Sequence, residues 1–513
     1  MKKGPFLKIL SITTAVLILS SIGIYYGISR ALSSDPFMPL YVENCSSCHG
    51  EDMAGGALGR PLVGGALVHG DTVADLSASI ARGFPQKGMP GWSDTLSEAE
   101  IRSLAILIAE RRVNRRFTDF RTSQPLEIPL EPIKTELATF RLEIVATGLD
   151  PFPFSIAPLP DGNILLTEKK RGLSVISPHG VQSALIEHTP KTSDVGFEVL
   201  GLDYGLGWHL DVKPHPDYPH NGWIYLLHTD LCSGCGDGEE EDGLIPKTMN
   251  RLVRGRIKDG AWVDEEVIWR VAREFYTSMP DIAAGGRIAF DPEGYVFLSV
   301  GIKALSNYLG VQDLATPYGK IHRIRDDGEI PTDNPFIDTP GAQSSIWSYG
   351  HRSPQGLEFD PVSRQLWGSE MGPRGGDEIN LLEAGRNYGW PLYSKGVDYD
   401  GTPVEYWKDL GIEFNLNDIE QPVVDLTPSP AVSSFVIYDA DLFPAWRGSF
   451  IVGSLKATEL YRVVIEDGVH VHTELLLRDL ARIRDVEIGY DGLIYLLLEH
   501  ETGSQIVRLA PMV

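Results

Sequence analysis

The sequence RIAFDPEGYVFLSV occupies residues 287–300. Two β-rich runs flank an Asp-Pro-Glu-Gly turn, which is a pattern that predicts a β-hairpin. Five further stretches resemble it, and most share its plan of a strand, a turn with Asp, Pro or Gly, and an aromatic-rich strand. They occupy residues 154–168, 210–228, 356–370, 448–464 and 485–498.

Six such stretches between residues 137 and 513 give a period of roughly 63 residues. A repeat of this kind is typical of a β-propeller, in which similar sheets are arranged around an axis. A pair of packed β-sheets would also contain hairpins, but it would not explain their recurrence. The sequence therefore predicts a mostly β fold with a six-bladed β-propeller at 137–513.

The length, composition and net charge of the chain exclude some classes of fold and partner. The chain has 513 residues, which predicts at least two domains, and its 53 Gly and 35 Pro favour a turn-rich β body. The formal net charge of −25 argues against nucleic acid as a partner, because phosphate binding needs a basic surface. A neutral substrate such as a sugar or an alcohol is compatible with this charge.

The first 33 residues predict a membrane anchor or a signal segment. Lys2, Lys3 and Lys8 precede an uncharged apolar stretch at 9–28, which is long enough to cross a bilayer as a helix. The basic flank places the N-terminus in the cytoplasm. We expect a single N-terminal transmembrane helix in the bacterial inner membrane with the body in the periplasm; a cleaved signal peptide is the alternative.

Residues 34–116 contain the attachment signature of a c-type haem, C-x-x-C-H. Cys45 and Cys48 would bind the haem vinyl groups, and His49 would be the proximal iron ligand. Met89, in a Gly-Met-Pro-Gly loop, is the candidate second axial ligand. A capping box of Ser97 and Glu100 then predicts a closing helix. This segment resembles a class I c-type cytochrome, a small all-α domain.

Residues 117–136 contain Pro125, Pro129 and Pro132 and predict an extended linker. Two further cysteines, Cys232 and Cys235, lie in the propeller beside an acidic run and are not followed by His. A loop disulfide is the favoured interpretation in an exported protein, and a two-cysteine metal site is the alternative.

Several motifs resemble the PQQ-dependent soluble aldose sugar dehydrogenases, the glucose/sorbosone dehydrogenase family. The longest is SEMGPRGGDEINLLEAGRNYGWP at residues 369–391, and GHRSPQG at 350–356 and GSLK at 453–456 are others. The resemblance runs from about residue 140 to the end. It implies a six-bladed propeller that binds pyrroloquinoline quinone (PQQ) at a shallow site on its top face.

Motif matches assign the residues that would bind the cofactor. PQQ carries three carboxylates and an ortho-quinone, so guanidinium groups suit the former and a lysine ammonium can polarise the latter. Ser353 stands where the family has Asn. The matching residues are Arg352, Ser353, Lys456, Arg482 and Arg484.

The resemblance also implies calcium, a cation that prefers oxygen ligands. Gly372 and Pro373 match the family's ion beside the cofactor, although Met371 replaces a Gln that precedes them. Glu378, the carbonyl of Tyr388 and Asp398 match a structural ion.

The expected general base is missing. The family carries a His four residues before the Arg of a G-G-R or S-G-R motif, and Ala283 occupies that position here. Alanine cannot accept the proton of a substrate hydroxyl. His209, or less readily Asp281, could serve instead. Alternatively, the propeller binds PQQ or another ligand without oxidising a sugar.

The sequence thus predicts a quinohaemoprotein dehydrogenase. A sugar or a related alcohol or hemiacetal would be oxidised with PQQ, and electrons would pass to the chain's own haem c. A downstream acceptor such as another cytochrome or an oxidase would then receive them.

Overall fold

A computed structural model describes most of the chain. Two compact units form, one containing the long helices of the N-terminal region and the other containing the strands. The proposed anchor at 9–28, Cys235 and Asp281 lie outside the described residues. The described ranges are 35–115, 126–193, 195–199, 202–232, 246–278, 283–303 and 310–512.

The N-terminal unit is helical, as predicted. Ser97 caps its longest helix: the Ser97 side chain accepts a hydrogen bond from the Glu100 N–H, and Glu100 accepts one from the Ser97 N–H, which confirms the capping box. Ile101, Leu104 and Ile108 of this helix are buried. The helices are α2 (Met38–Asn44), α3 (Ser46–His49), α4 (Val73–Arg82) and α5 (Glu98–Arg112).

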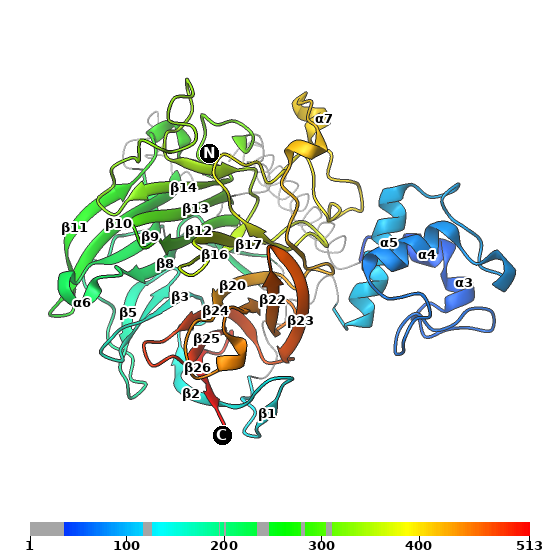
Figure 1. Cartoon of the computed structure of the whole chain (residues 1–513), viewed down its shortest axis with the longest axis horizontal. Helices are drawn as coiled ribbons and strands as arrows, with labels where there is room; N and C mark the ends of the chain where they lie inside the picture. Colours follow the sequence, from blue (N-terminus) through cyan, green and yellow to red (C-terminus); the bar gives the residue numbers. More distant parts are fainter. Residues whose placement is uncertain are drawn as a thin grey trace, which may run out of the picture. The chain divides into compact units, whose positions relative to one another are not determined.

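The first three blades of the second unit are antiparallel sheets of consecutive strands (Figure 1). Blade 1 contains β3 (Pro153–Pro158), β4 (Ile164–Glu168) and β5 (Gly172–Ile176). Blade 2 contains β8 (His209–Pro214), β9 (Ile224–Leu231), β10 (Thr248–Lys258) and β11 (Ala261–Trp269). Blade 3 contains β12 (Ala283–Phe290), β13 (Tyr295–Lys303), β14 (Lys320–Arg325) and β15 (Ile346–Tyr349).

The next two blades repeat this order. Blade 4 contains β16 (Pro354–Asp360), β17 (Gln365–Glu370), β18 (Glu378–Leu381) and β19 (Val424–Asp425). Blade 5 contains β20 (Val432–Ile437), β21 (Phe450–Ser454), β22 (Leu460–Glu466) and β23 (Val469–Leu477). Between blades lie β6 (Gly196–Val199) with β7 (Leu202–Gly205), and blades 2 and 4 carry α6 (Tyr218–Asn221) and α7 (Trp407–Leu410).

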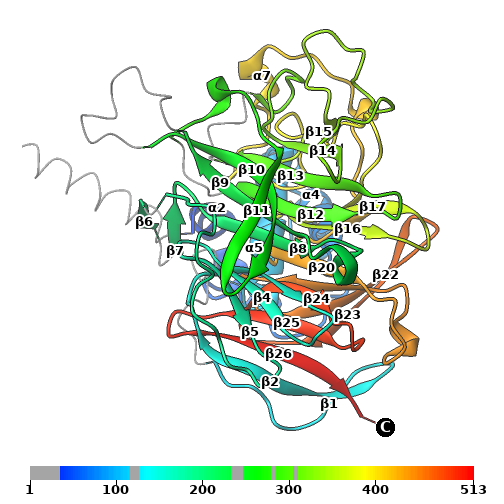
Figure 2. The same ribbon diagram turned by 90° about the vertical axis from the view of Figure 1, so that its left-hand side faces the viewer.

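Blade 6 joins the two ends of the propeller sequence. Its strands from the C-terminal end are β24 (Arg482–Ile488), β25 (Ile494–Glu499) and β26 (Ser504–Pro511). The earlier strand β2 (Thr139–Leu149) pairs with β26, and β1 (Ile133–Lys134) pairs with β2 (Figure 2). The two ends of this unit are therefore held together by main-chain hydrogen bonds.

The first strands of the six blades close into a ring. Each of β3, β8, β12, β16, β20 and β24 contacts the next, and β24 contacts β3. Buried apolar side chains pack between neighbouring blades, as where Leu210 and Leu227 of blade 2 meet Ile288 and Leu298 of blade 3. This arrangement confirms the predicted six-bladed propeller.

One predicted hairpin has a different place in its blade. The stretch at 448–464 forms β21 and β22, the second and third strands of blade 5, whereas the other five stretches contribute first and second strands. Strands β20 and β21 are joined instead through a short 3-10 helix, Pro444–Trp446, in which the Trp446 side chain is fully buried. Among the described residues, no helix is long and apolar enough to cross a membrane.

Candidate functional site

The starts of the innermost strands and the ends of the second strands lie at one end of the propeller. The register pairs Pro153 with Glu168, Ala283 with Lys303, Pro354 with Glu370 and Arg482 with Glu499. Residues just before a first strand or just after a second strand therefore gather on this end, which we call the top face. Most of the polar residues singled out in the sequence lie there: they are His209, Arg352, Ser353, Lys456, Arg482 and Arg484.

Arg482 and Arg484 share one carboxylate. Arg482 Nε lies 2.8 Å from Glu499 Oε1, and Arg484 Nε and Nη2 lie 2.7 and 2.6 Å from Oε2. All three side chains are buried. Although burial opposes it, the charges of Arg484, Lys169 and Arg482 hold the pKa of Glu499 well below its usual range. Glu499 is therefore ionised, and it orients both guanidinium groups.

Lys169, which the sequence interpretation missed, is the third cation of this cluster. Its Nζ lies 3.4 Å from Glu499 Oε2 and 4.9 Å from the centre of the Trp208 ring. Burial first, and then repulsion from Arg484, lower the pKa of Lys169 to about 7. One carboxylate thus faces three basic groups, so the cluster can accept a further anion.

Arg352 and Ser353 precede β16 in blade 4. The main-chain N–H groups of both donate to the Glu370 carboxylate, which also lies 3.0 Å from His351 Nδ1. The Arg352 guanidinium donates to the carbonyl oxygens of Met371 (3.1 Å) and Gly372 (2.9 Å). Gly372 O is one of the expected calcium ligands, and Arg352 contacts it here.

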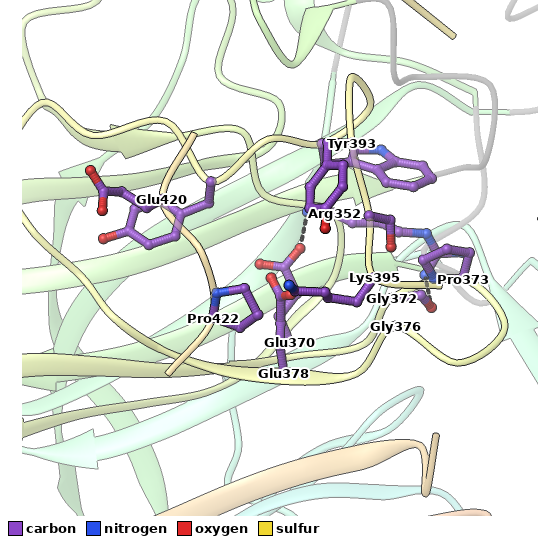
Figure 3. A pocket seen from close by; sticks show the side chains of 13 residues that line it. Arg352, Glu370, Gly372, Pro373, Gly376, Glu378, Tyr393, Lys395, Glu420 and Pro422 are labelled. Atoms are coloured by element: carbon purple, nitrogen blue, oxygen red, sulfur yellow. Dashed lines mark hydrogen bonds between the residues drawn. The ribbon is translucent and has the colours of Figure 1, made fainter. Parts of the chain in front are cut away.

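A small cavity in blade 4 contains part of the expected calcium set (Figure 3). Gly372, Pro373, Glu378 and Tyr388 line it, whereas Asp398 is not among its described lining residues. Burial, and then the charge of the neighbouring Glu370, raise the pKa of Glu378 to about 8. Two carboxylates this close would be stabilised by a cation.

The fit to calcium is incomplete in the described part of the chain. The described residues contain no group of three or more His, Cys, Asp or Glu arranged to hold a metal ion. An ion bound at Glu370 and Glu378 would thus need main-chain oxygens as well, which calcium accepts. Figure 3 shows the Lys395 ammonium directed toward the same two carboxylates.

The environment of His209 does not favour a role as general base. The residue starts β8 and is 3% exposed. Its Nε2 lies 2.8 Å from the carbonyl oxygen of Pro190, and its Nδ1 lies 3.3 Å from that of Lys169. Burial lowers its pKa. Both ring nitrogens face main-chain acceptors, which is the arrangement of a structural histidine.

Ala283 starts β12 and is buried, so the absence of a base at this position holds in the structure as in the sequence. Directly across the sheet, Lys303 donates to Thr248 Oγ1 at 2.7 Å and to Thr248 O at 3.1 Å. Lys456 follows β21 and is half-buried, and its main-chain N–H donates to Pro430 O.

Beneath these residues, a buried ion pair fills the centre of the ring. Arg287 Nη1 lies 2.7 Å from Asp485 Oδ1 and 3.5 Å from Asp211 Oδ1. Asp485 also accepts from the Ile156 N–H, and Asp211 from the Ile288 N–H, both at 2.8 Å. Blades 1, 2, 3 and 6 are thereby joined at the axis, which gives the top face a rigid base.

Comparison with known proteins decides the family. The family model described as "Glucose / Sorbosone dehydrogenase" matches residues 151–508. The chain belongs to the glucose/sorbosone dehydrogenase family. The aldose sugar dehydrogenase YliI of Escherichia coli is 33% identical over 383 residues, covering 73% of this chain and 94% of that protein.

Solved structures agree with the fold of this family. The apo-form aldose sugar dehydrogenase of Escherichia coli is 31% identical, with a TM-score of 0.60, covering 73% of this chain and 100% of that one. A PQQ-bound aldose sugar dehydrogenase of Streptomyces coelicolor is 24% identical, with a TM-score of 0.54, covering 75% of this chain and 100% of that one. The second comparison supports the fold alone.

This family member carries an additional cytochrome c domain. Residues 37–108 match the model "Cytochrome C oxidase, cbb3-type, subunit III", and cytochrome c55X of Paracoccus denitrificans is 44% identical over 75 residues, covering 15% of this chain and 71% of that protein. His49 Nδ1 lies 2.8 Å from Arg60 O, so its Nε2 is the nitrogen suited to bind iron.

The surroundings of the motif fit a haem. Cys45 and Cys48 are free thiols, and the Gly59 N–H donates to Cys48 O. Met89 follows a 3-10 turn, and its main chain pairs with that of Phe84, which forms the predicted tight loop.

The structure also bears on the disulfide predicted for Cys232. Cys232 is disulfide-bonded, which supports a disulfide over a metal site for this residue. Lys169 and Glu499 were missed because neither belongs to a recognisable motif. Their signal is positional, since each ends or follows the second strand of its blade, as Glu370 and Lys456 do.

Proposed function

We propose that this protein is a quinohaemoprotein dehydrogenase that oxidises an aldose sugar, or a related alcohol or hemiacetal, with PQQ and transfers electrons to its own c-type haem. The observation that carries the proposal is the buried pair Arg482 and Arg484, held by Glu499 on the top face of a sugar dehydrogenase propeller. Buried guanidinium groups in excess over carboxylates suit a ligand with several carboxylates.

The basic and polar residues of the top face would each contact a different part of the cofactor. Arg352, Arg482 and Arg484 bind cofactor carboxylates, Ser353 adds a hydrogen-bonding group, and Lys456 polarises a quinone oxygen. When bound, PQQ would supply a hydride acceptor for the substrate carbon. To bind it, Arg352 would exchange its hydrogen bonds to the carbonyl oxygens of Met371 and Gly372 for a cofactor oxygen.

The cytochrome domain would supply a one-electron acceptor. Cys45 and Cys48 would attach the haem, while His49 and Met89 would hold the iron. A thioether ligand raises the reduction potential, as an internal acceptor requires. The next acceptor would be another cytochrome or an oxidase. We also propose that residues 1–33 anchor the protein in the inner membrane with its body in the periplasm.

Calcium belongs to the same proposal. Gly372 and Pro373 would hold an ion beside the cofactor, and Glu378, the carbonyl of Tyr388 and Asp398 would hold a structural one. The support for this is the acidic cavity of blade 4, where burial, and then the charge of Glu370, raise the pKa of Glu378.

The absence of an evident general base favours a second function, in which the propeller binds a ligand without oxidising a sugar. Ala283 is buried where the family has its base, and His209 has both ring nitrogens facing carbonyl oxygens. A propeller that binds PQQ or another ligand without oxidising sugars would have this appearance. Loss of a general base typically costs about 10²- to 10⁴-fold in rate.

A spectral titration separates the two functions. Purified haem-containing protein is loaded with PQQ and Ca²⁺, and aldoses are added without oxygen while the haem absorption is followed. We expect haem reduction that requires both sugar and PQQ. A Cys45→Ala/Cys48→Ala variant serves as the control, because it should bind PQQ yet show no haem signal. Tight PQQ binding without haem reduction by any sugar or alcohol would favour the second function.

A further inference from the structure

The basic cluster around Glu499 contains a residue that the family motifs do not include. Lys169 directly follows β4, so it belongs to blade 1, whereas Arg482, Arg484 and Glu499 belong to blade 6. The Lys169 ammonium lies 3.4 Å from Glu499 Oε2, the same oxygen that Arg484 contacts twice. Lys169 therefore shares the Glu499 carboxylate with two expected cofactor ligands, Arg482 and Arg484.

The groups that face Lys169 leave the cluster electropositive. Arg482 and Arg484 approach it from β24 and Glu499 from the end of β25, while the Trp208 ring packs against its ammonium at 4.9 Å. Of Lys169, His209 contacts only the main-chain oxygen, and burial lowers the pKa of its ring. Lys169 is 5% exposed, and Glu499 is the one carboxylate described among these three cations, so a further anion would be favourable there.

We propose that Lys169 is a further binding residue of the cofactor site and contacts a carboxylate of PQQ. This inference rests on the proposed function. The cofactor would then bind between blades 1 and 6 as well as above blades 4 and 5. The added carboxylate would compensate the positive charge that Glu499 alone does not balance.

The proposal gives PQQ binding a characteristic pH dependence. The pKa of Lys169 is lowered to about 7 in the unliganded protein, and a bound carboxylate would raise it. Below pH 7, Lys169 is already protonated, so PQQ binding takes up no proton. Above pH 7, Lys169 is mostly neutral, so PQQ binding takes up one proton. Glu499 keeps its charge between pH 6 and 8.5, because its pKa lies well below its usual value, and arginine side chains are not deprotonated in proteins. Affinity should fall by up to about tenfold per pH unit above pH 7.

The test is equilibrium binding of PQQ, followed by tryptophan fluorescence at pH 6 and pH 8.5, with no substrate and no turnover. Lys169→Met removes the charge at nearly constant length, and Lys169→Arg keeps a charge that does not titrate. The neighbouring Lys170→Met changes the net charge equally and serves as the matched control. Circular dichroism checks that each variant is folded.

We expect Lys169→Met to weaken binding at pH 6 about 10- to 100-fold, as for loss of one charged hydrogen bond, and to flatten the pH dependence. Lys169→Arg should bind at both pH values without the wild-type decline, and Lys170→Met should match wild type. Wild-type affinity and slope in Lys169→Met, or an unchanged slope in Lys169→Arg, would overturn this inference while leaving PQQ binding intact. Failure of wild type to bind PQQ at pH 6 would overturn both proposals.

Discussion

Replacing Asp485 by Asn should destabilise the propeller far more than the small change in side-chain size suggests. Asp485 Oδ1 binds Arg287 Nη1 at 2.7 Å, and its other oxygen accepts the Ile156 N–H at 2.8 Å. Asn has the same shape and can keep one acceptor, so no cavity forms. The change removes the charge that faces Arg287 and also replaces one acceptor oxygen with an N–H₂ donor, so it measures the loss of the ion pair together with one hydrogen bond.

The expected loss in free energy of unfolding follows from the burial of Arg287 and Asp485. Asp485 is fully buried, and the Arg287 side chain is 4% exposed. Although burial lowers it, Asp485 and then Asp211 raise the pKa of Arg287, so the guanidinium stays charged. Removing one partner of a buried pair costs about 3–5 kcal/mol. Because Asp211 remains at 3.5 Å, we expect a loss of about 3 kcal/mol, at the lower end.

The assay is urea unfolding followed by tryptophan fluorescence, with Glu293→Gln as the matched control. Glu293 pairs with Arg364, and their side chains are 44% and 57% exposed. Exposed pairs contribute about 0.2–1 kcal/mol, so the control should lose less than about 1 kcal/mol. If Asp485→Asn lost no more stability than Glu293→Gln, the axial ion pair would not be what stabilises the ring.

Three further changes test the site. His209→Asn should lower the rate of sugar oxidation by less than about tenfold with PQQ bound, because the His209 ring binds Pro190 O. A drop of about 100-fold in a folded variant would show that His209 is the general base. Met89→Ala should lower the haem reduction potential in a redox titration, whereas Met53→Leu, in the core, should not. Excess Ca²⁺ at about 100 times its dissociation constant should stabilise wild type by about 2.7 kcal/mol per bound ion in thermal unfolding, and should stabilise Glu378→Gln less, because the structural ion loses its carboxylate ligand; equal stabilisation of both would place the structural ion elsewhere.

The architecture could be predicted from the sequence because its signals are local. The turn at 291–294 defines a hairpin within residues 287–300, and the Ser97 capping box defines the start of α5 within residues 97–100. The 448–464 stretch forms a hairpin as predicted, but it supplies the second and third strands of blade 5, because the first connection of that blade contains a 3-10 helix with buried Trp446 in place of an Asp-Gly turn.

The composition of the site could be predicted only where a motif marks it. Arg482 and Arg484 were found through their motif, but Lys169 is 330 residues from Glu499 in the sequence, and only closure of the ring brings the two together. His209 was selected because it is polar and lies in the right loop. Which way its ring faces depends on Pro190 O and Lys169 O, two main-chain atoms that no side-chain pattern reveals.

The pairing of β2 with β26 has a consequence for synthesis of the chain. Phe140 is made near the beginning of the propeller, and its partner Pro511 is made only after the first five blades. Until then, the edge of β2 that faces β26 has no partner on the nascent chain, because β26 has not yet been made. The cytochrome domain precedes all of this and can be complete early. A premature stop that removed β26 alone would spare the five preceding blades and still leave the ring unable to close.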